Sequence, residues 1–124
     1  LAKNYNLPNI QFIKNNGSDF PSIKKHSIDL IFSFGTFVHF DIDIIEEYLK
    51  NIKPLLKASS NVIIQYSDRT KPLGYETIVN TGDNRGFSDN DPERMRELIK
   101  KSGYKIYEED TKTMWHSSII RFGL

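Results

Sequence analysis

The sequence predicts an α/β fold, in which parallel strands alternate with helices and an antiparallel strand pair follows at the C-terminal end. Residues 28–34 form an almost continuous apolar run, typical of a strand buried on both faces of a parallel sheet. Residues 42–57 have apolar side chains at helical spacing, and a short apolar strand, 62–66, follows. Residues 104–109 and 114–122 indicate two strands joined by a short turn. A strand, a helix and a strand make a parallel crossover unit, so we expect ligands at the strands' carboxyl ends.

The N-terminal segment adds a further strand to this prediction. Residues 1–6 resemble the end of a helix, and a turn is expected at Pro8. Residues 10–14 then indicate a short strand, and the Asn-Asn-Gly-Ser sequence of residues 15–18 indicates the loop that leaves it.

The helix predicted at 42–57 has recognisable end signals. Asp41 can cap its first turn, and Pro54 should loosen its last turn. A turn is expected at residues 58–60, before the strand at 62–66. The helix therefore leads directly into a neighbouring strand of the sheet.

Residues 67–90 are polar and glycine-rich, without sustained periodicity. This stretch is too long for a simple connection, so it is either a lid on the substrate side or a flexible surface loop. Order returns with a helix that Asp91 can cap, with Pro92 in its first turn and Gly103 just past its end.

Composition limits the class of protein. The 124 residues are enough for one domain, spanning 1–124, and the net charge of +1 gives no strong field to attract nucleic acid. There is no cysteine, which excludes disulfides and thiolate metal sites. No segment resembles a signal peptide or a membrane span, so the sequence predicts a cytoplasmic protein that does not bind membranes.

The order of the elements resembles the second half of a class I S-adenosylmethionine-dependent methyltransferase. Residues 27–41, SIDLIFSFGTFVHFD, look like the fourth strand of that family and the loop after it, with the pair Val38-His39. Residues 45–68 resemble the following helix and fifth strand, and residues 87–106 resemble the later helix and sixth strand. The resemblance covers nearly the whole chain and implies a partial Rossmann-like methyltransferase sheet.

Two hallmarks of the family have no counterpart in this sequence. These are the glycine-rich cofactor loop after the first strand and the acidic residue that holds the ribose of the cofactor. The resemblance therefore implies a truncated domain, the C-terminal part of the catalytic unit, inactive on its own. Exposed strand edges invite pairing, so a homodimer or a swapped oligomer is a further expectation.

The resemblance assigns two groups of residues to S-adenosylmethionine. The group at the end of the third strand, against the adenine, consists of Asn16, Gly17 and Ser18. The group at the end of the fourth strand, near the methionine moiety, consists of Ser33, Phe34 and Gly35. An amide suits the adenine edge, and glycine permits close approach of the backbone. An ordinary turn would use the same residue types.

His39 is the one histidine expected at the ligand edge, and it is the candidate for a general base. The alternative is a histidine that anchors the loop, since methyl transfer depends mainly on alignment of the reactants. Tyr66, Asp68 and Trp115 are further residues that could face the acceptor. The histidines are too scattered for a metal site, so no metal is predicted.

Two hypotheses about function follow. The first is methyl transfer from S-adenosylmethionine to a small or peptide-borne acceptor, with this chain supplying part of the catalytic domain. The alternative is a non-catalytic interaction module that keeps the methyltransferase-like half-fold and binds a partner through its open edge.

Overall fold

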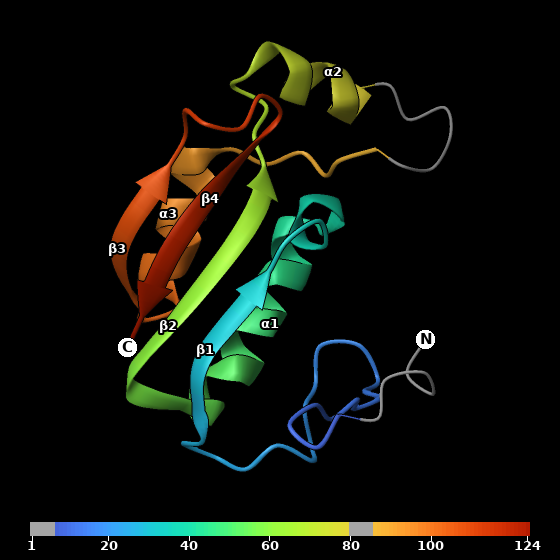
Figure 1. The fold of residues 1–124 in the computed structure, drawn as a ribbon. Helices are drawn as coiled ribbons and strands as arrows, with labels where there is room; N and C mark the ends of the chain where they lie inside the picture. The colour runs from blue at the N-terminus through green and yellow to red at the C-terminus, as the bar shows by residue number, and fades with distance from the viewer. Residues whose placement is uncertain (1–6, 80–85) are drawn as a thin grey trace.

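The computed structural model describes residues 7–79 and 86–124 and shows a four-stranded sheet with the spatial order β1-β2-β4-β3 (Figure 1). The strands are β1 (Ile28–Ser33), β2 (Leu56–Ser67), β3 (Lys105–Asp110) and β4 (Ser117–Gly123). β1 runs parallel to β2, whereas β4 is antiparallel to both β2 and β3. The predicted α/β class, with an antiparallel C-terminal pair, is confirmed.

Three helices accompany the sheet: α1 (Ile42–Ile52), α2 (Pro72–Val79) and α3 (Pro92–Lys101). Figure 1 shows α1 and α3 side by side behind one face of the sheet, and α2 beyond the carboxyl ends of β1 and β2. Two short 3₁₀ turns, Phe37–His39 and Lys53–Leu55, flank α1. The strand, helix and strand of the crossover unit, β1, α1 and β2, are therefore present, with α1 and α3 on a single face of the sheet.

The hydrophobic core lies between the sheet and these two helices. Val62 pairs with Phe122 and Ile64 with Ile120, so these four side chains share the face that the helices cover. The helices contribute the fully buried residues Ile45, Leu49, Met95 and Ile99.

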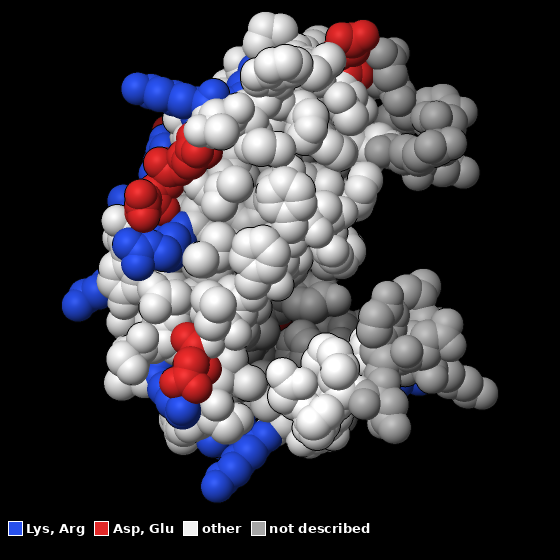
Figure 2. Space-filling model, viewed as in Figure 1, with Lys and Arg blue, Asp and Glu red and all other residues white. Residues whose placement is uncertain are grey.

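The opposite face of the sheet is bare at β1, which corrects the prediction of a strand buried on both faces. Leu30 and Phe32 are 56% and 65% exposed, whereas Ile31, between them, packs against the core. The strand alternates in this way because the described helices that pack on the sheet lie on one side of it. Figure 2 shows the bare face as largely uncharged, with the charged side chains gathered towards β3.

The strand predicted at residues 10–14 is not formed. The segment has no strand partner among the described residues, and Ile10 and Phe12 are 45% and 57% exposed. A strand needs a neighbour to satisfy its backbone, so the propensity of the segment is not enough. The helix end predicted at residues 1–6 lies outside the described residues.

The boundaries around α1 also differ from the prediction. The α-helix ends at Ile52, and Pro54 lies in the 3₁₀ turn that follows. Asp41 precedes the helix, but its side chain makes no capping hydrogen bond. The turn expected at residues 58–60 is instead an irregular part of β2, where the strand partner shifts between Ile28 and Leu30.

The segment after β2 contains α2, which the sequence did not predict. Its eight residues make about two turns and lack a clear apolar stripe, so periodicity could not reveal it. The later helix is confirmed: Asp91 Oδ1 accepts from the backbone N–H of Arg94, and Gly103 follows the helix with φ +78°.

Candidate functional site

The loop after β1 lies at the carboxyl edge of the sheet, where the sequence predicts the ligand. Gly35 has a positive φ of +76°, and no heavy atom lies within 4 Å of where its Cβ would stand. Its N–H donates to Gln65 Oε1 (2.8 Å), and Gln65 Nε2 donates to Ser117 Oγ (2.7 Å). The buried Gln65 side chain therefore ties the loop across β2 to the beginning of β4.

The predicted cofactor residues of this loop differ in accessibility. Phe34 is 53% exposed and Gly35 is exposed, whereas Ser33 is half-buried at the end of β1. Two of the three residues can thus be reached by a ligand without any rearrangement of the loop.

His39 contacts the end of the long segment that follows β2. Its Nδ1 lies 3.1 Å from the carbonyl oxygen of Gly86. A carbonyl can only accept, so Nδ1 is the donor of this hydrogen bond. The ring meets Phe87 edge-on at 5.5 Å, and Phe87 meets His116 in the same way at 5.1 Å. His39 therefore anchors the loop after β1 to residues 86 and 87.

Residues 86–88 lie against the loop after β1. Ser88 N–H donates to the carbonyl of Val38 (2.8 Å), and Ser67 Oγ donates to the carbonyl of Ser88 (2.5 Å). These two bonds connect the predicted lid segment to the loop after β1 and to the carboxyl end of β2. The part at residues 80–85 lies outside the described residues.

Asn16, Gly17 and Ser18 form a turn on the surface of α1. Gly17 has φ +103°, and its carbonyl accepts from Asn15 Nδ2 (2.7 Å) and from Tyr48 Oη (3.1 Å). The turn predicted from the residue types is present, and α1 holds it in place. The side chain of Asn16 is exposed.

An open pocket of about 410 Å³ lies beside this turn. Its lining comprises Asn16, Gly17, Ser18, Phe40, Ile44, Glu47 and Tyr48. The rings of Phe40 and Tyr48 are stacked, with centroids 5.3 Å apart and an interplanar angle of 17°. The pocket thus combines a flat aromatic wall with polar backbone and amide groups.

The structure brings the first predicted group together in this pocket, but it does not place the second group there. Ser33, Phe34 and Gly35 are not among the lining residues. The two groups are connected by the loop at residues 33–40, which begins at the end of β1 and reaches the pocket at Phe40.

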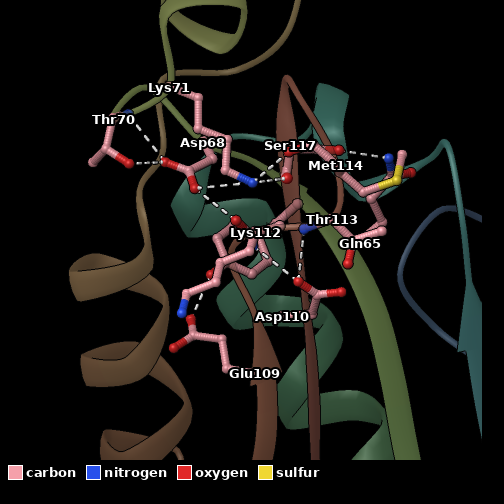
Figure 3. Close-up of polar contacts among 12 residues, drawn as sticks. Gln65, Asp68, Thr70, Lys71, Glu109, Asp110, Lys112, Thr113, Met114 and Ser117 are labelled. Carbon is pink, nitrogen blue, oxygen red and sulfur yellow. Dashed lines mark hydrogen bonds and ion pairs between the residues drawn. The ribbon is translucent and has the colours of Figure 1, made fainter.

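A buried carboxylate follows β2, at the same edge of the sheet (Figure 3). Asp68 is fully buried and accepts from Thr70 Oγ1 (2.5 Å) and Ser118 Oγ (2.6 Å). Lys71 Nζ lies 3.8 Å from Asp68 and donates to the carbonyls of Met114 (2.7 Å) and Ser117 (2.5 Å). Asp68 therefore joins the start of α2 to β4 and does not face an acceptor.

Tyr66 is also a structural residue. It is fully buried, and its Oη donates to Glu109 Oε1 (2.6 Å), while Arg96 donates to Glu109 Oε2 (2.8 Å). Burial, together with the hydrogen bond to Glu109, raises the pKa of Tyr66 well above its ordinary value. Trp115, by contrast, is 77% exposed.

Sequence reasoning did not identify Gln65 as part of the site. A polar residue in the otherwise apolar run of β2 was a usable signal, because a buried amide must find partners.

The described residues contain no group of three or more potential metal ligands among His, Cys, Asp and Glu. In the described part of the chain, no helix is long and apolar enough to cross a membrane.

The fold of this chain is similar to that of several solved structures. No protein-family model matches the sequence, and the search of curated proteins finds no match. Among solved structures, an enzyme described as a pericyclic reaction enzyme is similar, with a TM-score of 0.74, 18% identity and 99% of this chain covered. LepI in complex with S-adenosylmethionine is similar with a TM-score of 0.73 and 17% identity, and 99% of this chain is covered. An S-adenosylmethionine-dependent methyltransferase from Archaeoglobus fulgidus is similar with a TM-score of 0.68 and 14% identity, and 89% of this chain is covered.

The matched regions cover 32%, 33% and 66% of those three chains, so this chain spans about a third of the first two. The chain has the fold of part of a class I S-adenosylmethionine-dependent methyltransferase, as the sequence resemblance implied. At these identities the likeness concerns the fold. One of the three neighbours is described by a pericyclic reaction, so function must be argued from the site.

Proposed function

We propose that this chain takes part in methyl transfer from S-adenosylmethionine to a small or peptide-borne acceptor. The observation that carries the proposal is the loop after β1: Gly35 is exposed with a positive φ, and Gln65 holds it at the carboxyl edge of the sheet. Ligands of open α/β sheets bind at this edge. The similar structures whose titles name S-adenosylmethionine give the ligand class.

In this proposal, each of the two groups of residues contacts a different part of the cofactor. Asn16 is exposed beside the aromatic wall of Phe40 and Tyr48, where an amide and a flat ring suit a purine. Gly35 lets the backbone approach the methionine moiety, and Phe34 shields it. When bound, the cofactor supplies an activated methyl group. The chain's task is then to orient it towards the acceptor.

We assign His39 a positioning role first, because its Nδ1 holds Gly86 and so connects the two loops. Its Nε2 is our candidate general base towards an acceptor hydroxyl or amine. The sequence lacks the family's glycine-rich cofactor loop, so we expect this chain alone to bind the cofactor weakly and to be a poor catalyst. A cytoplasmic location stays a prediction from the absence of cysteine.

The proposal is tested by calorimetric titration of S-adenosylhomocysteine into the chain and into two variants, Asn16→Ala and Phe34→Ala. We expect weak binding that each variant weakens about three- to tenfold, since each removes one contact of about 1 kcal/mol. Tyr107→Ala on β3 is the control, because Tyr107 is exposed at the other edge of the sheet.

Equal affinities in all four proteins, or no binding at millimolar cofactor, would contradict the proposal. The second of these outcomes would favour the alternative, a non-catalytic interaction module. That alternative would bind its partner through the edge of β1, which no strand of the described residues covers.

A further inference from the structure

The side-chain amide of Gln65 can hold Gly35 in only one of its two orientations. The N–H of Gly35 can only donate, so the atom that faces it at 2.8 Å must be the amide oxygen Oε1. The other end of the amide, Nε2, can only donate, and it needs an acceptor because Gln65 is buried. The group that accepts from Nε2 therefore decides whether Gln65 holds the loop after β1.

Ser117 supplies this acceptor at the beginning of β4. Its Oγ lies 2.7 Å from Gln65 Nε2, and the serine is fully buried. A hydroxyl can donate or accept, but towards an amide nitrogen it can only accept. Ser117 Oγ thus favours the orientation of the amide that presents its oxygen to Gly35.

Ser117 is itself held by a buried lysine, Lys71, which lies between Asp68 and Ser117 (Figure 3). Lys71 Nζ donates to the carbonyls of Ser117 (2.5 Å) and Met114 (2.7 Å), and the carboxylate of Asp68, 3.8 Å away, balances its charge. Ser117 pairs with Ser67 at the end of the β2–β4 ladder, where strands fray most easily. Lys71 therefore adds the bonds that fix this end of β4 and the loop before it.

We propose that Ser117 is a positioning residue for the cofactor, because its hydroxyl orients the Gln65 amide towards Gly35. Lys71 keeps Ser117 in place, so a displacement of the β3–β4 loop weakens the hold on Gly35. The effect on the cofactor rests on the proposed function, whereas the effect on Gly35 does not depend on it.

The test measures hydrogen exchange of the Gly35 amide by NMR in the chain without cofactor. Ser117→Ala removes the acceptor of Gln65 Nε2, so we expect the Gly35 amide to exchange about fivefold faster, as for the loss of one hydrogen bond. S-adenosylhomocysteine should bind about fivefold more weakly for the same reason. Ser60→Ala is the matched control, because it removes a buried serine hydroxyl of β2 that has no hydrogen-bond partner among the described residues.

The variant Gln65→Glu separates orientation from packing. A carboxylate has an oxygen at both positions, so it accepts from Gly35 in either orientation. We expect Gln65→Glu to keep the slow exchange of Gly35, and Ser117→Ala to have little further effect in that background. Gln65→Met, of similar length but with only a weakly accepting sulfur, should lose the slow exchange.

The variant Lys71→Met tests the anchor of Ser117. It leaves Asp68 as an unpaired buried charge, so Asp68→Asn is combined with it to remove both charges together. We expect the double variant to regain most of the stability that Lys71→Met loses in urea unfolding. Its Gly35 amide should still exchange about threefold faster than in the original chain, a smaller effect than that of Ser117→Ala because Ser67 still pairs with Ser117.

Three outcomes would overturn the proposal. These are unchanged exchange of Gly35 in Ser117→Ala, an equal effect of Ser60→Ala, and an undiminished effect of Ser117→Ala in the Gln65→Glu background. Slow exchange of Gly35 in the double variant would overturn the role of Lys71.

The cofactor titrations distinguish this proposal from the proposed function. If Gly35 exchange follows the expected order while no protein binds S-adenosylhomocysteine, Ser117 positions the loop and the proposed function fails. Equal affinity of the original chain and Ser117→Ala would leave the proposed function standing and overturn the positioning of the cofactor by Ser117.

Discussion

Tyr66 shows how a single buried hydroxyl connects three elements. Its Oη donates from β2 to Glu109 on β3, and the same carboxylate accepts from Arg96 on α3. The neutral phenol is the form that fits this site, because burial raises its pKa well above the ordinary value. A second tyrosine, Tyr104, donates to the carbonyl of Leu49 (2.5 Å), and burial raises its pKa as well.

These raised pKa values predict a loss of stability at alkaline pH. Below about pH 10, the ordinary pKa of tyrosine, both states keep the proton and the stabilisation is complete. Above it the unfolded chain loses the proton first, so the free energy of unfolding falls as pH rises. Tyr66→Phe should remove up to about 1.4 kcal/mol per pH unit of this slope, measured by urea unfolding between pH 9 and 12.

Tyr107→Phe is the matched control, because it also removes one phenol hydroxyl, from an exposed side chain outside the contacts of Tyr66 with Glu109. A Tyr66→Phe protein with the same slope as the unmodified chain would show that the phenol does not carry this pH dependence.

At the scale of elements, α2 is positioned by a close backbone contact. A Cβ on Gly74 would collide with the carbonyl oxygen of Asp68 and lie 2.8 Å from that of His116. Both neighbours are backbone atoms, so neither can move aside as a flexible side chain would. Only glycine lets the helix lie this close to the ends of β2 and β4.

Gly74→Ala should therefore destabilise the protein by about 1–3 kcal/mol, although alanine is the better helix former by about 1 kcal/mol. Chemical unfolding measures the change. Glu76→Ala, at an exposed position of the same helix, should be neutral within about 0.5 kcal/mol. A Gly74→Ala protein as stable as the original would mean that α2 does not pack in this way.

The elements that the sequence predicts well are those with a complete local pattern. α3 has a capping aspartate, an early proline and a terminal glycine, and it was found as expected. The segment at residues 10–14 and the helix α2 failed for different reasons. The first has strand propensity without a neighbour, and the second is too short to show periodicity.

In the candidate site, too, local features could be predicted from the sequence and contacts between distant residues could not. The turn at Gly17 and the loop at Gly35 could be predicted, because glycine and asparagine mark positive φ locally. The bond from Gly35 to Gln65 could not, because it joins residues 30 positions apart across two strands. Nor could the sequence show that Leu30 and Phe32 lie bare, since that depends on which face the helices cover.

At the scale of the whole molecule, one face of the sheet carries the helices and the core, while the β1 end of the other face is open. An apolar sheet face is normally buried against another layer. We assign the cofactor to the loops at the carboxyl edge of the sheet and to the turn on α1.

The most direct test of the central claim, that these loops bind the cofactor, is to follow the backbone amides by NMR while S-adenosylhomocysteine is added. This measurement detects millimolar binding, which is the strength expected of a chain without the glycine-rich loop. We predict shifts at residues 16–18 and 33–35 and at Phe40 and Tyr48 of the aromatic wall, with Gly35 prominent and β3 unchanged. No shift up to the solubility limit, or shifts only elsewhere, would contradict the claim and leave a methyltransferase fold without a cofactor site.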